Sequence, residues 1–169
     1  MKKAAVLLAV LILLSALTGC SAEIKNDTPE ALIQNYLNAV KDKDYEAIWN
    51  MIPSKIQDYA IDRNIIADKE DGLDYIYYAV NDYYWLVSLD LPSRDHYSFE
   101  IIEVYTEDKH NIQQYLTNNG IKLVVEEAQF VECSITAGDI QQDASFFLIK
   151  SGDFWYMASV VGDDEIFVY

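Results

Sequence analysis

The strongest constraint on the fold is a change of hydrophobic period near Arg94. Before this residue, apolar side chains recur with the helical period of about 3.6 residues. After it, apolar and polar side chains alternate, which is typical of half-buried strands. Helices followed by strands with short connections predict an α+β fold, in which the N-terminal helices pack on one face of an antiparallel sheet of about four strands.

Cap residues define where the first helices begin. Thr28 is a natural N-cap, and Pro29 suits the first helical position. The first expected helix begins at Pro29 and ends in the run Lys41–Asp44. A short second helix is expected to hold Tyr45, Ile48 and Trp49 inward and to be broken by Pro53. Two further helices are expected at 54–61 and 69–89.

Alternation predicts four strands in the second half of the chain. They are expected at 97–106, 121–137, 144–150 and 154–161. In the first strand, Phe99, Ile101 and Tyr105 are expected on one face. Ile102 and Val104 are then expected on the other face.

The connections between these strands carry their own signals. A short helix is expected at 107–118, capped by Thr106 and stopped by Gly120. The alternation slips near Glu126-Glu127, which predicts a β-bulge there. Gly138-Asp139 and Ser151-Gly152 are turn signals, so the last three strands are expected to form an antiparallel meander.

Composition excludes some classes of partner. The chain has 169 residues, with 12 Lys or Arg and 28 Asp or Glu, which gives a net charge of −16. Binding to nucleic acid requires a basic face, and docking on anionic lipid also requires cations, so neither is expected. Hydrophobic residues make up 51% of the chain, enough to form a folded core.

The first 20 residues have the features of an export signal. Lys2 and Lys3 precede an apolar stretch, Ala4–Leu17, that is shorter than the roughly 20 residues of a membrane span. The tetrapeptide Leu-Thr-Gly-Cys that ends at Cys20 resembles the lipobox of bacterial lipoproteins. An ordinary secretory leader with a chance cysteine is the alternative.

The lipobox resemblance implies a lipid anchor and a division of the chain. It implies that Cys20 receives a diacylglyceryl group and becomes the mature N-terminus, and that the protein is held at the bacterial cell membrane, facing outside the cytoplasm. Residues 1–19 are then the signal peptide, 20–27 the lipidated cysteine and a polar tether, and 28–169 a single domain. Ser21 leaves open whether the host has one membrane or two.

Cys133 is the second of two cysteines, so no disulfide within the chain is expected once Cys20 is lipidated. It lies in an apolar run, which predicts a buried and unreactive thiol. A catalytic thiol would need a histidine partner, and His96 and His110 are the candidates.

Three segments together resemble the nuclear transport factor two-like (cystatin-like) superfamily. They are the capped helix start Thr28–Glu30, the second helix Lys43–Trp49 and the late strand Ser151–Ala158. The resemblance covers about 28–161 and implies a cone-shaped α+β fold with a pocket between a curved sheet and a long helix. It also implies that a homodimer can form through the sheet. The helix at 107–118 departs from the simplest plan of the family and leaves the strand order open.

Tyrosines concentrate on the predicted helix at 69–89. They are Tyr75, Tyr77, Tyr78, Tyr83 and Tyr84, beside Trp85. At 100° per residue, Tyr77 and Tyr84 fall on the apolar stripe of this helix. Tyr75, Tyr78 and Trp85 point elsewhere, so they are either amphipathic rim residues or an aromatic surface for a ligand or a second subunit.

Carboxylates are the second group of candidate site residues. One of them could point into the pocket and transfer protons: Asp82, Glu100, Glu103, Glu126, Glu127 or Glu132. Acidic clusters at Asp68, Glu70, Asp71 and Asp74 and at Asp163, Asp164 and Glu165 either bind calcium weakly or are solvated. No metal-ligand motif or cofactor fingerprint occurs in the sequence, so no metal and no cofactor is expected.

The sequence therefore favours a membrane-anchored, non-catalytic module that binds a small ligand or a protein of the cell envelope. The alternative is a small-molecule enzyme, of the isomerase or dehydratase kind, that uses a pocket carboxylate and a tyrosine. A role in protecting or regulating a neighbouring membrane complex fits the same features as the first hypothesis.

Overall fold

A computed structural model describes residues 25–78, 97–137 and 140–158. In the described part of the chain, the helices before the sheet are α2 (Pro29–Asp42), α3 (Tyr45–Asn50), α4 (Ser54–Asp62) and α5 (Lys69–Tyr78). The hydroxyl of Thr28 accepts a hydrogen bond from the backbone N–H of Ala31, so the predicted cap is confirmed. The helix expected at 69–89 is confirmed as far as residue 78, and 79–89 lie outside the described residues.

The strands form one antiparallel sheet in the order of the sequence. They are β1 (Tyr97–Thr106), β2 (Glu127–Ala137), β3 (Ile140–Ser151) and β4 (Phe154–Met157), each paired with the next. The α+β class is confirmed, and the meander includes all four strands. Gly152 has a φ of +63° in the turn between β3 and β4, a conformation that glycine adopts without strain. Gly138-Asp139 and residues 159–161 lie outside the described part.

The helix between β1 and β2 begins later than expected. This helix, α7 (Lys109–Asn118), is capped by Asp108, whose carboxylate accepts the backbone N–H of His110. The predicted cap at Thr106 is wrong because β1 continues through that residue. The predicted stop is confirmed, since Gly120 has a φ of +76°.

Residues 121–126 are not the first part of a strand, so that prediction is wrong. Their backbone bonds to α7 or to β3 instead of forming a ladder with β1. Ile121 N–H donates to the carbonyl of Leu116 at 2.8 Å, and Val125 N–H donates to the side chain of Gln113 at 2.9 Å. The slip at Glu126-Glu127 therefore marks the beginning of β2 at Glu127, not a bulge inside it.

The irregularity lies in β1 instead. Its pairing with β2 shifts by one residue between Ile101 and Glu103, so Ile102 is an extra residue in the ladder. Val104 consequently pairs with Val131 on the inner face of the sheet. Tyr105 turns to the outer face, where it pairs with Phe130. The predicted faces of Val104 and Tyr105 are thus wrong, because strict alternation fails at the extra residue.

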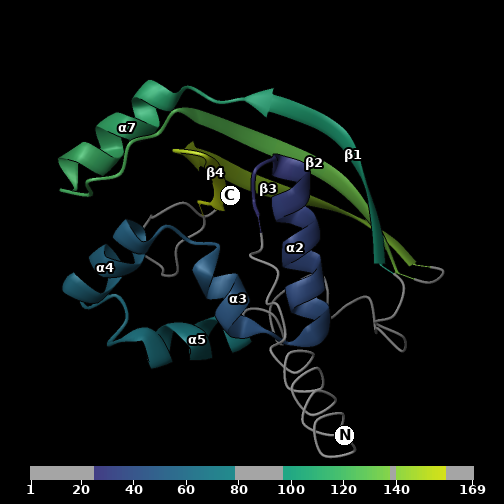
Figure 1. Cartoon of the computed structure of the whole chain (residues 1–169), viewed down its shortest axis with the longest axis horizontal. Coiled ribbons are helices and arrows are strands. Elements are labelled where there is room, and N and C mark those ends of the chain that lie inside the picture. The colour runs from purple at the N-terminus through teal and green to yellow at the C-terminus, as the bar shows by residue number, and fades with distance from the viewer. Residues whose placement is uncertain (1–24, 79–96, 138–139, 159–169) are drawn as a thin grey trace, which may run out of the picture.

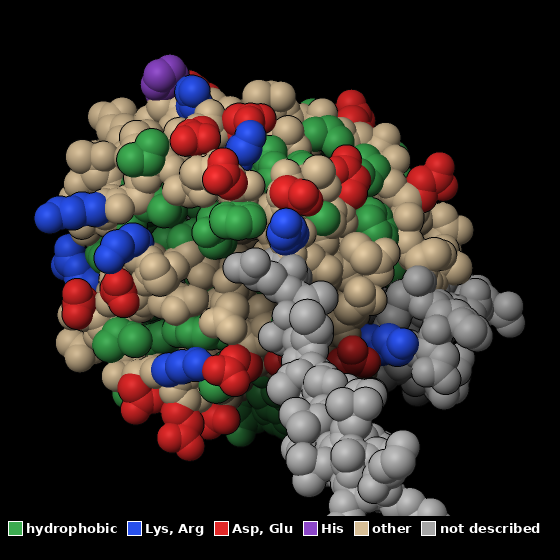
Figure 2. All heavy atoms as spheres, viewed as in Figure 1, with side chains coloured by type: hydrophobic (Ala, Val, Ile, Leu, Met, Phe, Trp, Pro, Cys, Tyr) green, Lys and Arg blue, Asp and Glu red, His purple; other side chains and the backbone are tan. Residues whose placement is uncertain are grey.

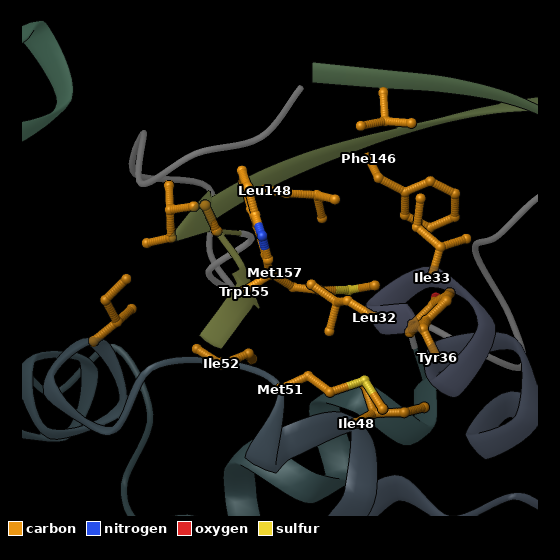
Figure 3. Packing of buried hydrophobic residues seen from close by; sticks show 14 of the residues in the cluster. Leu32, Ile33, Tyr36, Ile48, Met51, Ile52, Phe146, Leu148, Trp155 and Met157 are labelled. Carbon is orange, nitrogen blue, oxygen red and sulfur yellow. The ribbon is translucent and has the colours of Figure 1, made fainter. Parts of the chain in front are cut away.

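The core lies between the inner face of the sheet and the helices. The strands curve over α2, with α3, α4 and α5 on the same side (Figure 1). Side chains of β3 and β4 point toward α2 and the segment after α3 (Figure 3). The ring of Tyr36 meets that of Phe146 edge to face, with 5.7 Å between centroids. The most fully buried side chains include Leu32, Ile33, Leu37, Val131, Cys133, Ile135 and Leu148.

The described domain begins before the first helix. Asn26 is buried, and its backbone carbonyl accepts the N–H of Trp155 in β4 at 2.7 Å. Its side-chain oxygen accepts a hydrogen bond from Asn35 of α2 at 2.8 Å. Asn26, placed in the tether by the sequence, therefore joins the edge of the sheet to α2.

Candidate functional site

The outer face of the sheet, which points away from α2, carries a one-sided charge. We define it by the side chains of β1 to β4 that alternate with the buried inner ones. The carboxylate side chains on this outer face are Glu100, Glu103, Glu132 and Asp143. No described outer-face position carries Lys, Arg or His. In Figure 2, acidic and hydrophobic side chains lie next to one another at the upper right of the surface, over the strands.

Two of these carboxylates oppose each other. Glu103 of β1 is the direct cross-strand partner of Glu132 of β2, and like charges in this position repel. The hydroxyl of Tyr105 donates a hydrogen bond to Oε2 of Glu103 at 2.7 Å. This bond, followed by desolvation and by the charges of Glu103 and Glu132, raises the pKa of Tyr105 to about 12. The tyrosine therefore remains a hydrogen-bond donor to Glu103 even in solution more alkaline than its ordinary pKa.

An aromatic pair lies beside the two carboxylates. The rings of Tyr105 and Phe130 have centroids 6.4 Å apart, and Tyr105 is 41% exposed. Ile102, the extra residue of the bulge, is 54% exposed on the same edge strand. The bulge thus places an acidic pair and an aromatic pair side by side on the outer face.

The candidate proton-transfer residues that the structure describes do not reach the interior. Within the described residues, the carboxylates proposed for this role are all at least partly exposed: Glu100, Glu103, Glu126, Glu127 and Glu132. Glu127 forms an ion pair with Lys150 at 2.7 Å. Asp82 lies outside the described residues. The carboxylate–tyrosine pair of Glu103 and Tyr105 lies on the outer face, where water competes for both groups.

A second aromatic surface lies on α5. Tyr75 and Tyr78, both predicted to point away from the stripe, are 43% and 57% exposed. Tyr77 is 46% exposed and meets Tyr45 and Tyr78 edge to face, so its predicted place on the buried stripe is wrong. The buried side of α5 is formed by Gly72 and Ile76. Trp85 lies outside the described residues.

Cys133 and His110, the thiol and imidazole candidates within the described residues, do not form a nucleophilic pair. Cys133 is fully buried on β2, as predicted, and burial raises the pKa of its thiol to about 11. His110 is exposed in the first turn of α7. His96 and Cys20 lie outside the described residues.

Two members of the acidic cluster at the start of α5, Asp68 and Asp71, have a structural role. Asp68 accepts a hydrogen bond from the backbone N–H of Asp71, and Asp71 accepts one from Ala67. These two bonds fasten the segment that precedes α5 to its first turn. Within the described ranges, no group of three or more His, Cys, Asp or Glu side chains is arranged to hold a metal ion. Asp163, Asp164 and Glu165 lie outside them.

The pairing of Tyr105 with Phe130 is the site feature that the alternation pattern missed. Its signal was the doublet Ile101-Ile102, two apolar residues in succession within a strand that otherwise alternates. Such a doublet in an edge strand is compatible with a bulge.

Two further observations concern the chain as a whole. None of the helices in the described ranges has both the length and the apolar character of a membrane span. In comparisons with protein-family models, curated proteins and solved structures, nothing matches this chain.

Proposed function

We propose that this chain is a bacterial lipoprotein, anchored by lipid on Cys20, whose α+β domain is a non-catalytic module that binds another protein outside the cytoplasm. We also propose that the domain is a variant of the nuclear transport factor two-like cone. The curved sheet over α2 supports this reading, while α7 between β1 and β2 is an addition to the simplest plan.

The observation that carries the binding role is the composition of the outer face. Exposed aromatic and aliphatic side chains lie there among carboxylates that have no cation on the same face of the described strands. A carboxylate would need burial to be tuned for proton transfer at neutral pH. The described carboxylates are solvated, which favours binding over catalysis.

The anchor supports the same role. Two or three acyl chains hold a protein on a membrane almost permanently, since each buried methylene contributes about 0.8 kcal/mol. A strongly acidic domain is repelled by anionic lipid, so membrane attachment through lipid leaves its faces available to partners.

The anchor is tested by replacing Cys20 with Ala in the full-length chain, with Ser21→Ala as the matched control. Membrane fractionation and labelling with radioactive palmitate are the readouts. We expect C20A to lose the label and S21A to retain it. Palmitate labelling of C20A equal to that of the unmodified sequence would disprove the anchor.

The binding role is tested by native mass spectrometry of the full-length chain released from neutral detergent. We expect the mass of the lipidated polypeptide alone. A stoichiometric small molecule that is lost on denaturation would instead indicate a ligand-filled pocket, and the small-molecule hypothesis would replace the present one.

A further inference from the structure

We propose that the outer face of β1 and β2 binds an extended segment of a partner polypeptide that carries arginine or lysine. This inference rests on the proposed function as an interaction module and names the chemistry of the partner.

The negative charge of this face favours the binding of a cation. Glu103 and Glu132 oppose each other across the ladder, and Glu100 lies on the same face of β1. Like charges directly opposite are destabilising, and a guanidinium or ammonium group between them removes the repulsion. Since none of the described strands supplies a cation on this face, a partner is the source that fits.

The aromatic pair favours arginine as that cation. Successive side chains on one face of a strand lie about 7 Å apart, so Tyr105 is within reach of a group that binds Glu103. A guanidinium can stack on an aromatic ring and also bond a carboxylate through its planar donors. The hydroxyl of Tyr105 occupies one oxygen of Glu103, and the remaining lone pairs can accept bonds from the partner.

The sheet edges favour a polypeptide over a small cation. At β4, the N–H of Trp155 donates to Asn26 and the N–H of Met157 donates to Met51, so that edge is occupied. For the outer edge of β1, no backbone bond of this kind occurs among the described residues. β1 is an edge strand of the described sheet, and such a strand can pair with an added one on either side of the bulge at Ile102.

Charge also disfavours a second copy of this chain as the partner that binds to β1. Two copies paired through β1 would bring Glu100 and Glu103 of one chain close to the same residues of the other. Each chain also has a net charge of −16. A basic segment does not meet this repulsion, and the exposed side chain of Ile102 offers it an apolar contact.

The binding chemistry is tested with a fluorescent peptide of alternating arginine, threonine and valine, titrated against the full-length chain in neutral detergent. Glu103→Gln combined with Glu132→Gln removes the opposed carboxylates. Glu70→Gln combined with Asp74→Asn is the matched control, because both residues are exposed on α5 and the change in charge is the same. Circular dichroism checks that both variants fold.

We expect the dissociation constant to rise at least tenfold for E103Q/E132Q and less than twofold for the control. Tyr105→Ala should raise it at least threefold. A peptide with glutamine in place of arginine should not bind. If both double variants weakened binding equally, the peptide would be held only by the overall negative charge of the domain, and the proposal would be wrong. Equal binding of the glutamine peptide would also overturn it.

A photo-crosslinking residue at Ile102, compared with one at Tyr75, separates this proposal from the proposed function. In cells that make the protein, an adduct at position 102 with an arginine- or lysine-bearing segment supports both. Adducts at position 75 alone, or with a second copy at position 102, overturn this inference and leave an interaction module. No adduct at either position counts against both.

Discussion

Gly72 of α5 lies against the six-membered ring of Trp49 of α3, at its Cζ3 and Cη2 atoms. A Cβ atom built on Gly72 would come within 2.7 Å of Cη2 of Trp49 and 3.2 Å of Cδ1 of Ile66. The glycine is therefore required for the close approach of the two helices. No unusual backbone angle is involved, since Gly72 is not among the positive-φ glycines of the described residues.

Gly72→Ala should destabilise the domain because the added methyl group overlaps a buried ring. Overpacking of this kind costs about 1–3 kcal/mol, even though alanine is the better helix former. Urea unfolding measures the change. In a double-mutant cycle, Trp49→Leu should reduce the cost of the alanine. Additive effects of the two changes would argue against the contact.

Tyr105 should ionise about two pH units later than an ordinary tyrosine. Its pKa is about 12 because its hydroxyl donates to Glu103. Glu103→Gln should therefore bring the pKa down toward 10, whereas Glu100→Gln should change it little. Carbon NMR of labelled tyrosine, assigned with Tyr105→Phe, provides the measurement.

The raised pKa of Tyr105 also determines whether the stability of the domain rises or falls with pH in alkaline solution. Between about pH 10 and pH 12 the unfolded tyrosine loses its proton while the folded one keeps it, so the folded state binds more protons. The contribution of Tyr105 to stability should be complete below pH 10 and lost as pH rises to 12. Tyr105→Phe should make unfolding less dependent on pH in this range. An unchanged slope would contradict the hydrogen bond.

Deletion of Ile102 should be tolerated. Removing the extra residue restores regular alternation and leaves Ile101 facing inward and Glu103 outward, as they are now. We expect a change in the free energy of unfolding of about 1 kcal/mol or less, since Ile102 is exposed.

Deletion of Val104 is the matched control, because it also shortens β1 by one residue. Either Glu103 or Tyr105 must then turn to the apolar inner face, at a cost of about 2 kcal/mol or more. Urea unfolding of both deletions decides the matter. A larger loss for the Ile102 deletion would contradict the register of β1.

Cys133 should be protected from thiol reagents in the folded protein. It is fully buried, and the pKa of its thiol is about 11, so little thiolate exists at pH 8. With Cys20 blocked by lipid, the folded chain should show no reactive thiol, and one should become reactive in guanidinium. Cys133→Ala should abolish that signal. Rapid reaction of the folded protein would contradict the burial of β2.

The N-terminal helices could be predicted because their signals are local. Thr28 and Pro29 fix the start of α2 through a side-chain bond and a preset backbone angle, and neither depends on distant contacts. The alternation from Tyr97 to Thr106 likewise gives the bounds of β1 as observed.

Register could not be predicted in the same way. Ile101 and Ile102 are equally apolar, so only the pairing with Cys133 decides which of them faces inward. The segment after Gly120 alternates like a strand, but its backbone bonds to α7. The first outcome depends on a strand that is distant in sequence. The second depends on capping and side-chain bonds to the neighbouring helix, which alternation does not encode. The outer-face site, which the bulge creates, was therefore not visible in the pattern.

The bonds of Asn26 limit how the domain can move on a membrane. With lipid on Cys20, as proposed, six residue steps separate the anchor from the fold. Fully extended, they reach about 21 Å. A domain of this size is roughly 37 Å wide. The domain could then rotate about the membrane normal but could not turn over. The edge of β4 would stay next to the bilayer, and β1, at the opposite edge of the sheet, would be the side that an approaching molecule meets first.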